Sequence, residues 1–160
     1  IRRLRNGGQT DRYHHVEAGI NSRLDELQAA ILRAKLPGLA AATAKRRALA
    51  AVYRRALADT VSLVPELDQG HVYHLFPVRS QERDGFQSHL RRAGVETLIH
   101  YPLTLPQQPA FAALSPRECP AAARAAAEVI SLPLYPRLQE SDVLRVADAV
   151  RAFQKGRVLA

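Results

Sequence analysis

The spacing of apolar residues changes near Pro65, and this change constrains the fold more than any other feature of the sequence. Before it, apolar side chains recur three and four residues apart, as on one side of a helix. After it, short runs of β-branched and aromatic residues alternate with further helical stretches. A chain that mixes the two periods is expected to fold as an α+β domain, a small sheet with helices packed on it.

Five segments have the spacing of amphipathic helices. Ser22 and Asp25 form an S-x-x-D pattern that predicts the start of the first one. Pro37 either kinks that helix or opens the next one at its first turn. Gly94 is expected to end the third helix in a left-handed conformation. The helices after the first are predicted over residues 38–58, 84–93, 121–128 and 141–153.

Four short segments are predicted as strands, over residues 61–64, 72–78, 95–99 and 129–132. Pro77 has no amide hydrogen to give to a ladder, so the second strand is expected to end there or to lie near an edge. The polar, glycine-containing residues 1–19 are predicted to be irregular. Residues 101–120 are predicted to form a proline-rich loop with a turn at 107–113.

Positive charge is the main compositional bias. The chain of 160 residues has 23 basic and 15 acidic side chains, a net charge of +8. Such a charge fits either a nucleic-acid surface or solvated helix faces. Scattered arginine pairs and an aromatic content of only 6% favour the second interpretation. Arg47 and Arg54, on the 38–58 helix, are the best candidates for the first, and only weak, sequence-independent binding is expected from them.

Three observations bear on the compartment. Cys119 is the single cysteine, so an internal disulfide is excluded. No apolar run approaches the roughly 20 residues that span a bilayer. The chain begins at Ile1 and contains no Met, which indicates either a removed leader or a piece of a longer protein. A cytoplasmic protein is therefore expected, with no membrane contact.

Residue patterns for metal or nucleophile chemistry are weak. His71 and His74 would point to opposite faces of a strand, so no metal site is predicted. Cys119 is interpreted as a small, semi-buried thiol. The three lysines, Lys35, Lys45 and Lys155, lie at a helix end, on a polar helix face and near the chain end. None has the desolvated setting that a Schiff-base lysine needs, and no catalytic residue is assigned.

Longer motifs carry a specific resemblance. Residues 19–32 read G-I-N-S-R-L-D-E-L-Q-A-A-I-L, and residues 8–15 before them also match. Further on, H-Y-P at 100–102, Q-P-A-F at 108–111 and I-S-L-P-L-Y-P at 130–136 follow in order. These blocks resemble the DegT/DnrJ/StrS family of sugar aminotransferases, which depend on pyridoxal phosphate (PLP). The similarity runs from about residue 4 to residue 153.

The resemblance implies a fold and an assembly. The chain would be the C-terminal small domain of a type I PLP-dependent aminotransferase, preceded by a helical arm that contacts a dimer partner or a large domain. Residues 1–36 would form this arm and residues 37–160 the small domain with its linker helix. The family implies a homodimer or a partner aminotransferase subunit, with active sites built from both subunits. Its substrates are a nucleotide-linked keto sugar and an amino donor, Glu or Gln.

The resemblance implies a role for a residue only where that residue matches a family motif. Asn21 matches the asparagine that reaches the partner's PLP phosphate, although an N-cap role is an alternative. His100 and Tyr101 match residues at the substrate end of the cleft. The chain departs from the family at Gly7 and Pro106, where histidine is frequent, and the second departure concerns the substrate side. The residues that hold the cofactor ring, the Schiff-base lysine included, have no counterpart here.

Three interpretations therefore stand. The first is a C-terminal portion of an aminotransferase, inactive alone, that transfers an amino group from Glu or Gln to a keto sugar nucleotide. It would hold PLP only together with a complete large domain or partner subunit. The second is a non-catalytic module that docks on a full-length relative. The third, which the composition disfavours, is a basic nucleic-acid-binding domain.

Overall fold

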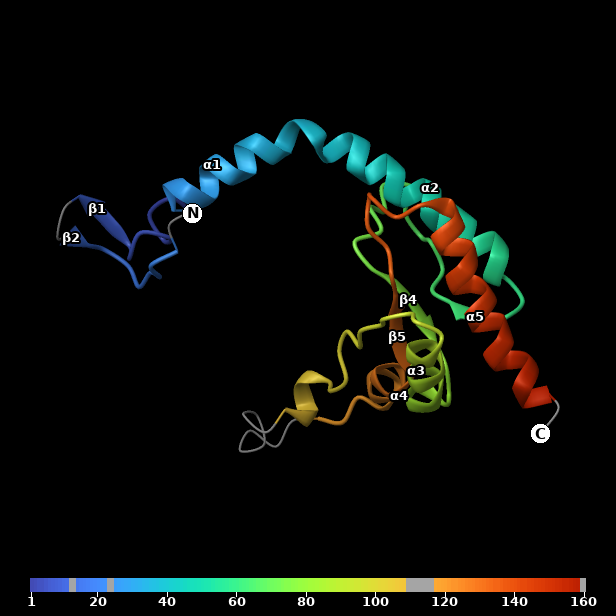
Figure 1. Ribbon diagram of the computed structural model, residues 1–160. Coiled ribbons are helices and arrows are strands. Elements are labelled where there is room, and N and C mark those ends of the chain that lie inside the picture. Colours follow the sequence, from blue (N-terminus) through green and yellow to red (C-terminus); the bar gives the residue numbers. More distant parts are fainter. Residues whose placement is uncertain (12–13, 23–24, 109–116, 159–160) are drawn as a thin grey trace. The chain divides into compact units, whose positions relative to one another are not determined.

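The computed structural model describes all residues except 12–13, 23–24, 109–116 and 159–160. It divides into two compact units, Ile1–Ala40 and Ala41–Ala160 (Figure 1). The predicted turn at 107–113 lies largely outside the described residues. Its described part is a short 3-10 helix, η2, at Leu105–Gln107.

The first unit contains a small hairpin that the sequence did not predict. Strands β1 (Gln9–Asp11) and β2 (His14–His15) pair antiparallel, so the prediction of an irregular segment over 1–19 was wrong there. Main-chain hydrogen bonds join the two sides of the unit, from Gly7 to Ile20 at 3.0 Å and from Ser22 to Arg5 at 2.9 Å. A hairpin closed by such bonds needs no alternating apolar pattern. The spacing of apolar residues therefore did not indicate strands here.

Helix α1 (Glu26–Lys35) begins later than the capping pattern predicted. Its N-cap residue is Asp25, whose side chain makes no capping bond. Ser22 lies upstream, where its amide is already bonded to the Arg5 carbonyl, and Asp25 itself has an extended backbone. At the other end, Pro37 lies in a 3-10 turn, η1 (Leu36–Gly38), and α2 (Leu39–Leu57) follows directly. Leu36 and Leu39 both have right-handed helical dihedral angles, so Pro37 lies at a helical junction between α1 and α2.

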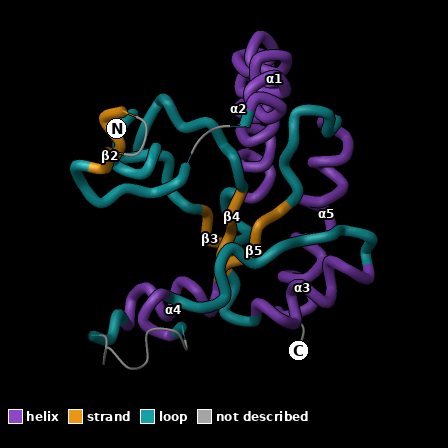
Figure 2. Tube along the Cα trace, turned by 90° about the vertical axis from the view of Figure 1, so that its left-hand side faces the viewer, coloured by secondary structure: helices purple, strands orange, loops and turns teal. Residues whose placement is uncertain are grey.

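The second unit is built on a three-stranded antiparallel sheet, shown in Figure 2. Its order is β3 (Ser62–Leu63), β4 (Phe76–Arg79), β5 (Val129–Leu132). Three more helices complete it: α3 (Arg83–Arg92), α4 (Pro120–Glu128) and α5 (Glu140–Val158). All four predicted helices after the first are confirmed, as is the strand at 129–132. Gly94 has the expected left-handed φ of 74°.

Two strand predictions need correction. Residues 95–99 form no strand, because the Val95 amide donates to the Leu90 carbonyl at 2.8 Å and closes the end of α3. Only Leu98 pairs, in an isolated bridge with Ser131. Residues 72–75 are also outside any strand. Tyr73 has a φ of 48°, and its amide donates to Nδ1 of His71 at 3.0 Å, so the chain turns there.

Pro77 lies in the central strand, not where the chain leaves the sheet. It pairs with Ser131, whose main-chain N–H and C=O are bonded to Leu98 on the far side. On its other side β3 ends at Leu63, which pairs with Val78. The proline therefore has no ladder bond to donate on either side, and a central strand tolerates it locally as an edge would.

One apolar core holds the second unit together. Helix α5 lies beside the second half of α2 in Figure 1, and Arg151 of α5 donates to the Ala56 carbonyl at 2.9 Å. Tyr53 stacks on Phe76, with ring centroids 4.8 Å apart. The fully buried larger side chains are Leu49, Tyr53, Leu57, Val78, Phe86, Leu90, Ile130, Val143 and Val150.

Burial of Tyr53 gives the stability a dependence on pH. Desolvation, and then the nearby Asp142 and Tyr135, raise the pKa of the Tyr53 phenol well above its usual 10.0. Above pH 10 the unfolded chain therefore releases this proton while the folded chain keeps it. Stability is fully present below pH 10 and is expected to fall above it, by up to about 1.4 kcal/mol per pH unit from this group. Urea unfolding of wild type and Tyr53→Phe between pH 9 and 11 measures the difference, and equal slopes would contradict it.

Three arginine side chains of α2 hydrogen-bond to main-chain carbonyls of the segment between β3 and β4. Arg46 donates to the Val72 carbonyl at 3.2 Å, and Arg54 donates to that of Val64 at 2.9 Å. Arg47 donates to the carbonyls of His71, at 2.7 Å, and Gln69. Arg47 and Arg54 thus lie on one helix, as the sequence suggested, but they donate hydrogen bonds to the chain's own carbonyl groups. These contacts weaken the nucleic-acid interpretation.

Removing one of these contacts is expected to destabilise the second unit. Arg47→Ala leaves two carbonyl groups without their charged donor, and we expect a loss of about 1–2 kcal/mol in the free energy of unfolding. Arg55→Ala is the matched control, because Arg55 is exposed on the same helix, and its change should stay within about 0.5 kcal/mol. Urea unfolding followed by circular dichroism compares the two. Equal losses would show that the Arg47 contacts add nothing.

Candidate functional site

The second unit has an open groove of about 830 Å³. Its walls come from the exposed side of α3, the segment after Gly94, the end of β5 with the residues that follow it, and the first turns of α5. Arg91, Arg145 and His74 bring basic groups to it, and Asp142 brings an acidic one. A volume of this size is typical of small-molecule sites.

His100 lines this groove and is held on one side of its ring. Its Nδ1 lies 3.0 Å from Oγ of Ser131, which also lines the groove. Tyr101 follows with its ring edge-on to the imidazole, the centroids 5.8 Å apart, and is 73% exposed. Of the two predicted substrate residues, His100 is therefore the one with a fixed orientation in the groove. The sequence marked Ser131 only as part of the 130–136 block, without a role.

Asn21 lies in the first unit, where its backbone pairs with Asn6. The capping alternative for this residue is wrong, because α1 begins at Glu26 with Asp25 as its N-cap. The Asn21 side chain is exposed. A neutral amide donor in this state suits a phosphate oxygen. Two residues before Asn21 the main chain packs closely, since a Cβ on Gly19 would lie 2.2 Å from the Gly8 nitrogen.

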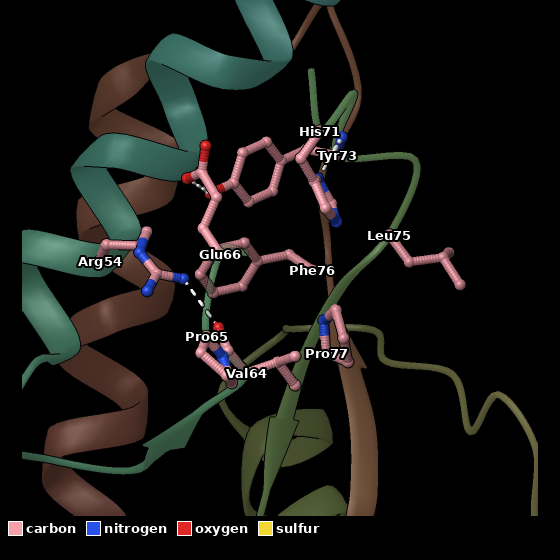
Figure 3. A pocket seen from close by; sticks show the side chains of 9 residues that line it. All are labelled: Arg54, Val64, Pro65, Glu66, His71, Tyr73, Leu75, Phe76 and Pro77. Carbon is pink, nitrogen blue, oxygen red and sulfur yellow. Dashed lines mark hydrogen bonds between the residues drawn. The ribbon is translucent and has the colours of Figure 1, made fainter. Parts of the chain in front are cut away.

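A second, much smaller pocket of about 40 Å³ lies between α2 and the residues before β4 (Figure 3). The Tyr73 hydroxyl bonds to Glu66, which also pairs with Arg47 at 3.5 Å. Burial and this bond raise the pKa of the Tyr73 phenol. The volume admits little more than one water. We therefore interpret this pocket as a packing gap between α2 and the residues before β4, and not as a ligand site.

The described residues offer little for metal or covalent chemistry. Within them, no group of three or more His, Cys, Asp or Glu side chains is arranged to hold a metal ion. His71 and His74 precede β4 instead of lying on it, so the argument from opposite strand faces does not apply, and His71 is bonded to Tyr73. Cys119 is exposed and not semi-buried as predicted.

The lysines do not fit a cofactor linkage. Lys35, Lys45 and Lys155 are all exposed on helices, and none lies in the desolvated setting that a Schiff-base lysine needs. The residues present thus fit one part of PLP, its phosphate, through Asn21, and do not fit its covalent attachment. In the described part of the chain, no helix is long and apolar enough to cross a membrane.

Comparison with known proteins identifies the family. Residues 1–151 match the DegT/DnrJ/EryC1/StrS aminotransferase family. The chain is 44% identical, over 96% of its length, to the dTDP-3-amino-3,4,6-trideoxy-alpha-D-glucose transaminase of Streptomyces venezuelae. It is 40% identical, over 98%, to the UDP-N-acetyl-3-dehydro-alpha-D-glucosamine 3-aminotransferase of Acidithiobacillus ferrooxidans. It spans only 42% and 43% of the lengths of these two relatives.

Comparison with solved structures supports the same family. The crystal structure of S. venezuelae DesV in complex with a ketimine intermediate superposes with a TM-score of 0.88 at 44% identity, covering 96% of this chain and 43% of that one. NtdA from Bacillus subtilis with bound cofactor PMP superposes with a TM-score of 0.79 at 30% identity, covering 96% and 38%. The predicted α+β small-domain fold is thereby confirmed. The chain belongs to the DegT/DnrJ/EryC1/StrS aminotransferase family.

Proposed function

We propose that this chain serves as the C-terminal part of a PLP-dependent aminotransferase that transfers an amino group from Glu or Gln to a nucleotide-linked keto sugar. The observation that carries the proposal is the 44% identity to a sugar nucleotide transaminase over 96% of the chain. In this proposal Asn21 binds the cofactor phosphate, and His100 and Tyr101 bind the substrate. The lysine that holds the cofactor comes from a large domain or a partner subunit.

The surface of the first unit supports an assembled state. Helix α1 has no buried residue, and Leu27 is 74% exposed, with Ile31 and Leu32 half exposed beside it. An apolar helix face of this kind favours association. We therefore propose that residues 1–36 contact a large domain or a dimer partner, and that residues 37–160 form the small domain over the active site. The lone Cys119 agrees with a reducing, cytoplasmic location.

A chimera tests the activity. The stretch of the S. venezuelae transaminase that aligns with this chain is replaced by residues 1–160. The chimera is then assayed with the amino sugar nucleotide that names that enzyme and with 2-oxoglutarate. We expect the chimera to bind PLP and to transfer the amino group. Chromatography of the sugar nucleotide measures the transfer. Asn21→Ala should weaken PLP binding about 10- to 100-fold, the loss of one bond to a charged group.

The control is Gln81→Ala, which removes an exposed amide between β4 and α3, outside the groove and the proposed contact, and should leave PLP binding unchanged. Two outcomes count against the proposal. A folded chimera that binds PLP without turnover would contradict the assignment of substrate residues. A folded chimera that binds no PLP would favour the non-catalytic docking module.

A further inference from the structure

We propose that Ser131 is a positioning residue for His100: its hydroxyl donates to Nδ1, fixes the imidazole and leaves Nε2–H as the donor available to a ligand in the groove. The juxtaposition joins residues 31 positions apart in the sequence, with Nδ1 and Oγ separated by 3.0 Å. The identity of that ligand as the aminotransferase substrate rests on the proposed function. The orientation of the ring does not.

Ser131 is buried and its main chain is paired on both sides. It is only 5% exposed, in the interior of β5. Its amide donates to the Leu98 carbonyl at 2.7 Å, and its carbonyl accepts from the Leu98 amide at 3.3 Å. On the other side it lies in register with Pro77 of β4. Its Cα is therefore fixed on both sides, and the hydroxyl has a defined position from which to orient His100.

The direction of the bond follows from hydrogen-bond accounting. A serine hydroxyl has one hydrogen to donate, and a buried one that donates nothing is costly. Among the described residues, Nδ1 of His100 is the hydrogen-bond partner of this hydroxyl. The hydroxyl therefore donates to Nδ1. In a neutral imidazole whose Nδ1 accepts, Nε2 carries the hydrogen.

The chemistry of the groove changes accordingly. Nε2 lies across the ring from Nδ1, away from the Ser131 hydroxyl. It presents an N–H group, so it binds an acceptor oxygen: a carbonyl, carboxylate or phosphate oxygen of the substrate. If the hydroxyl were absent, the ring could exchange tautomers and rotate, and the groove would offer a donor and an acceptor in turn. Ser131 thereby gives His100 one role in substrate binding.

Ring-nitrogen NMR of the uniformly ¹⁵N-labelled chain tests this without cofactor, substrate or activity. Spectra are recorded at alkaline pH, where neutral imidazole predominates. For His100 we expect Nε2 to carry the hydrogen and Nδ1 to be displaced from the value of a solvated imidazole. His74, which is exposed, gives that solvated reference. In Ser131→Ala both His100 nitrogens should move toward the His74 values, and Ser131→Thr, which keeps the hydroxyl, should restore them.

Ser80→Ala is the matched control. Ser80 is as buried as Ser131, at 6% exposed, but its hydroxyl has no hydrogen-bond partner among the described residues. Its loss should leave the His100 resonances in place. His100 resonances that stay unchanged in a folded Ser131→Ala chain would overturn the proposal. So would a hydrogen on Nδ1 in the wild type, which keeps the test decisive should Ser131→Ala not fold. Neither result bears on whether the chimera transfers amino groups, so the two proposals fail separately.

Discussion

Tyr53→Ala is expected to lower the free energy of unfolding of the second unit by about 3–5 kcal/mol, the range for removing a large aromatic from a core. The side chain is fully buried on α2 and stacks on Phe76. Its hydroxyl also donates to the Pro133 carbonyl at 3.0 Å, across 80 residues of sequence. The substitution leaves a cavity and an unpaired carbonyl together. Domains of this size have only about 5–15 kcal/mol in total.

Tyr53→Phe separates the two contributions. It keeps the ring and its stacking and removes only the hydroxyl, so a loss of about 1 kcal/mol is expected. Urea unfolding followed by circular dichroism measures both variants. If Tyr53→Ala cost no more than Tyr53→Phe, the ring would not be a core element, and the packing of α2 on the sheet would be wrong.

The elements that could be predicted from the sequence are those whose own residues decide their structure. Helices α2 and α5 have apolar stripes that recur with the helical period, and the strand at 129–132 is bounded by a helix and Pro133. Gly94 was predictable because few other residues adopt its φ of 74°. In each case the local pattern and the tertiary packing favour the same structure.

The errors arose where a hydrogen bond outside the segment's own pattern decides the structure. Val95 has strand propensity, but its amide bonds to the Leu90 carbonyl at the end of α3. Ser22 has a capping pattern, but its amide pairs with Arg5. The same holds for the site. His100 could be identified from the H-Y-P motif, whereas its bond to Ser131 depends on where the chain after α3 meets β5, and no spacing in the sequence encodes that meeting.

Gly8→Ala is expected to open the folded part of residues 1–22, the largest local effect we predict. Gly8 has a left-handed φ of 74°, which costs an L-residue about 1–2 kcal/mol. In addition, a Cβ there would lie 1.8 Å from the main-chain oxygen of Glu17. Main chain cannot yield as a flexible side chain can. The amides of Gly7, Val16 and Ile20, which are bonded to main-chain carbonyls, should lose their protection from hydrogen exchange.

Two other glycines separate the causes of this effect. Gly94 has the same φ but open space around it, so Gly94→Ala should cost only about 1 kcal/mol. Gly85, inside α3, also has open space, and Gly85→Ala should stabilise by about 0.5–1 kcal/mol. In the chimera, Gly8→Ala should weaken PLP binding at least as much as Asn21→Ala, because the same bonds hold the Asn21 backbone against Asn6. Full amide protection in Gly8→Ala would show that this segment tolerates a side chain at position 8. The position of the Asn21 backbone would then not depend on Gly8.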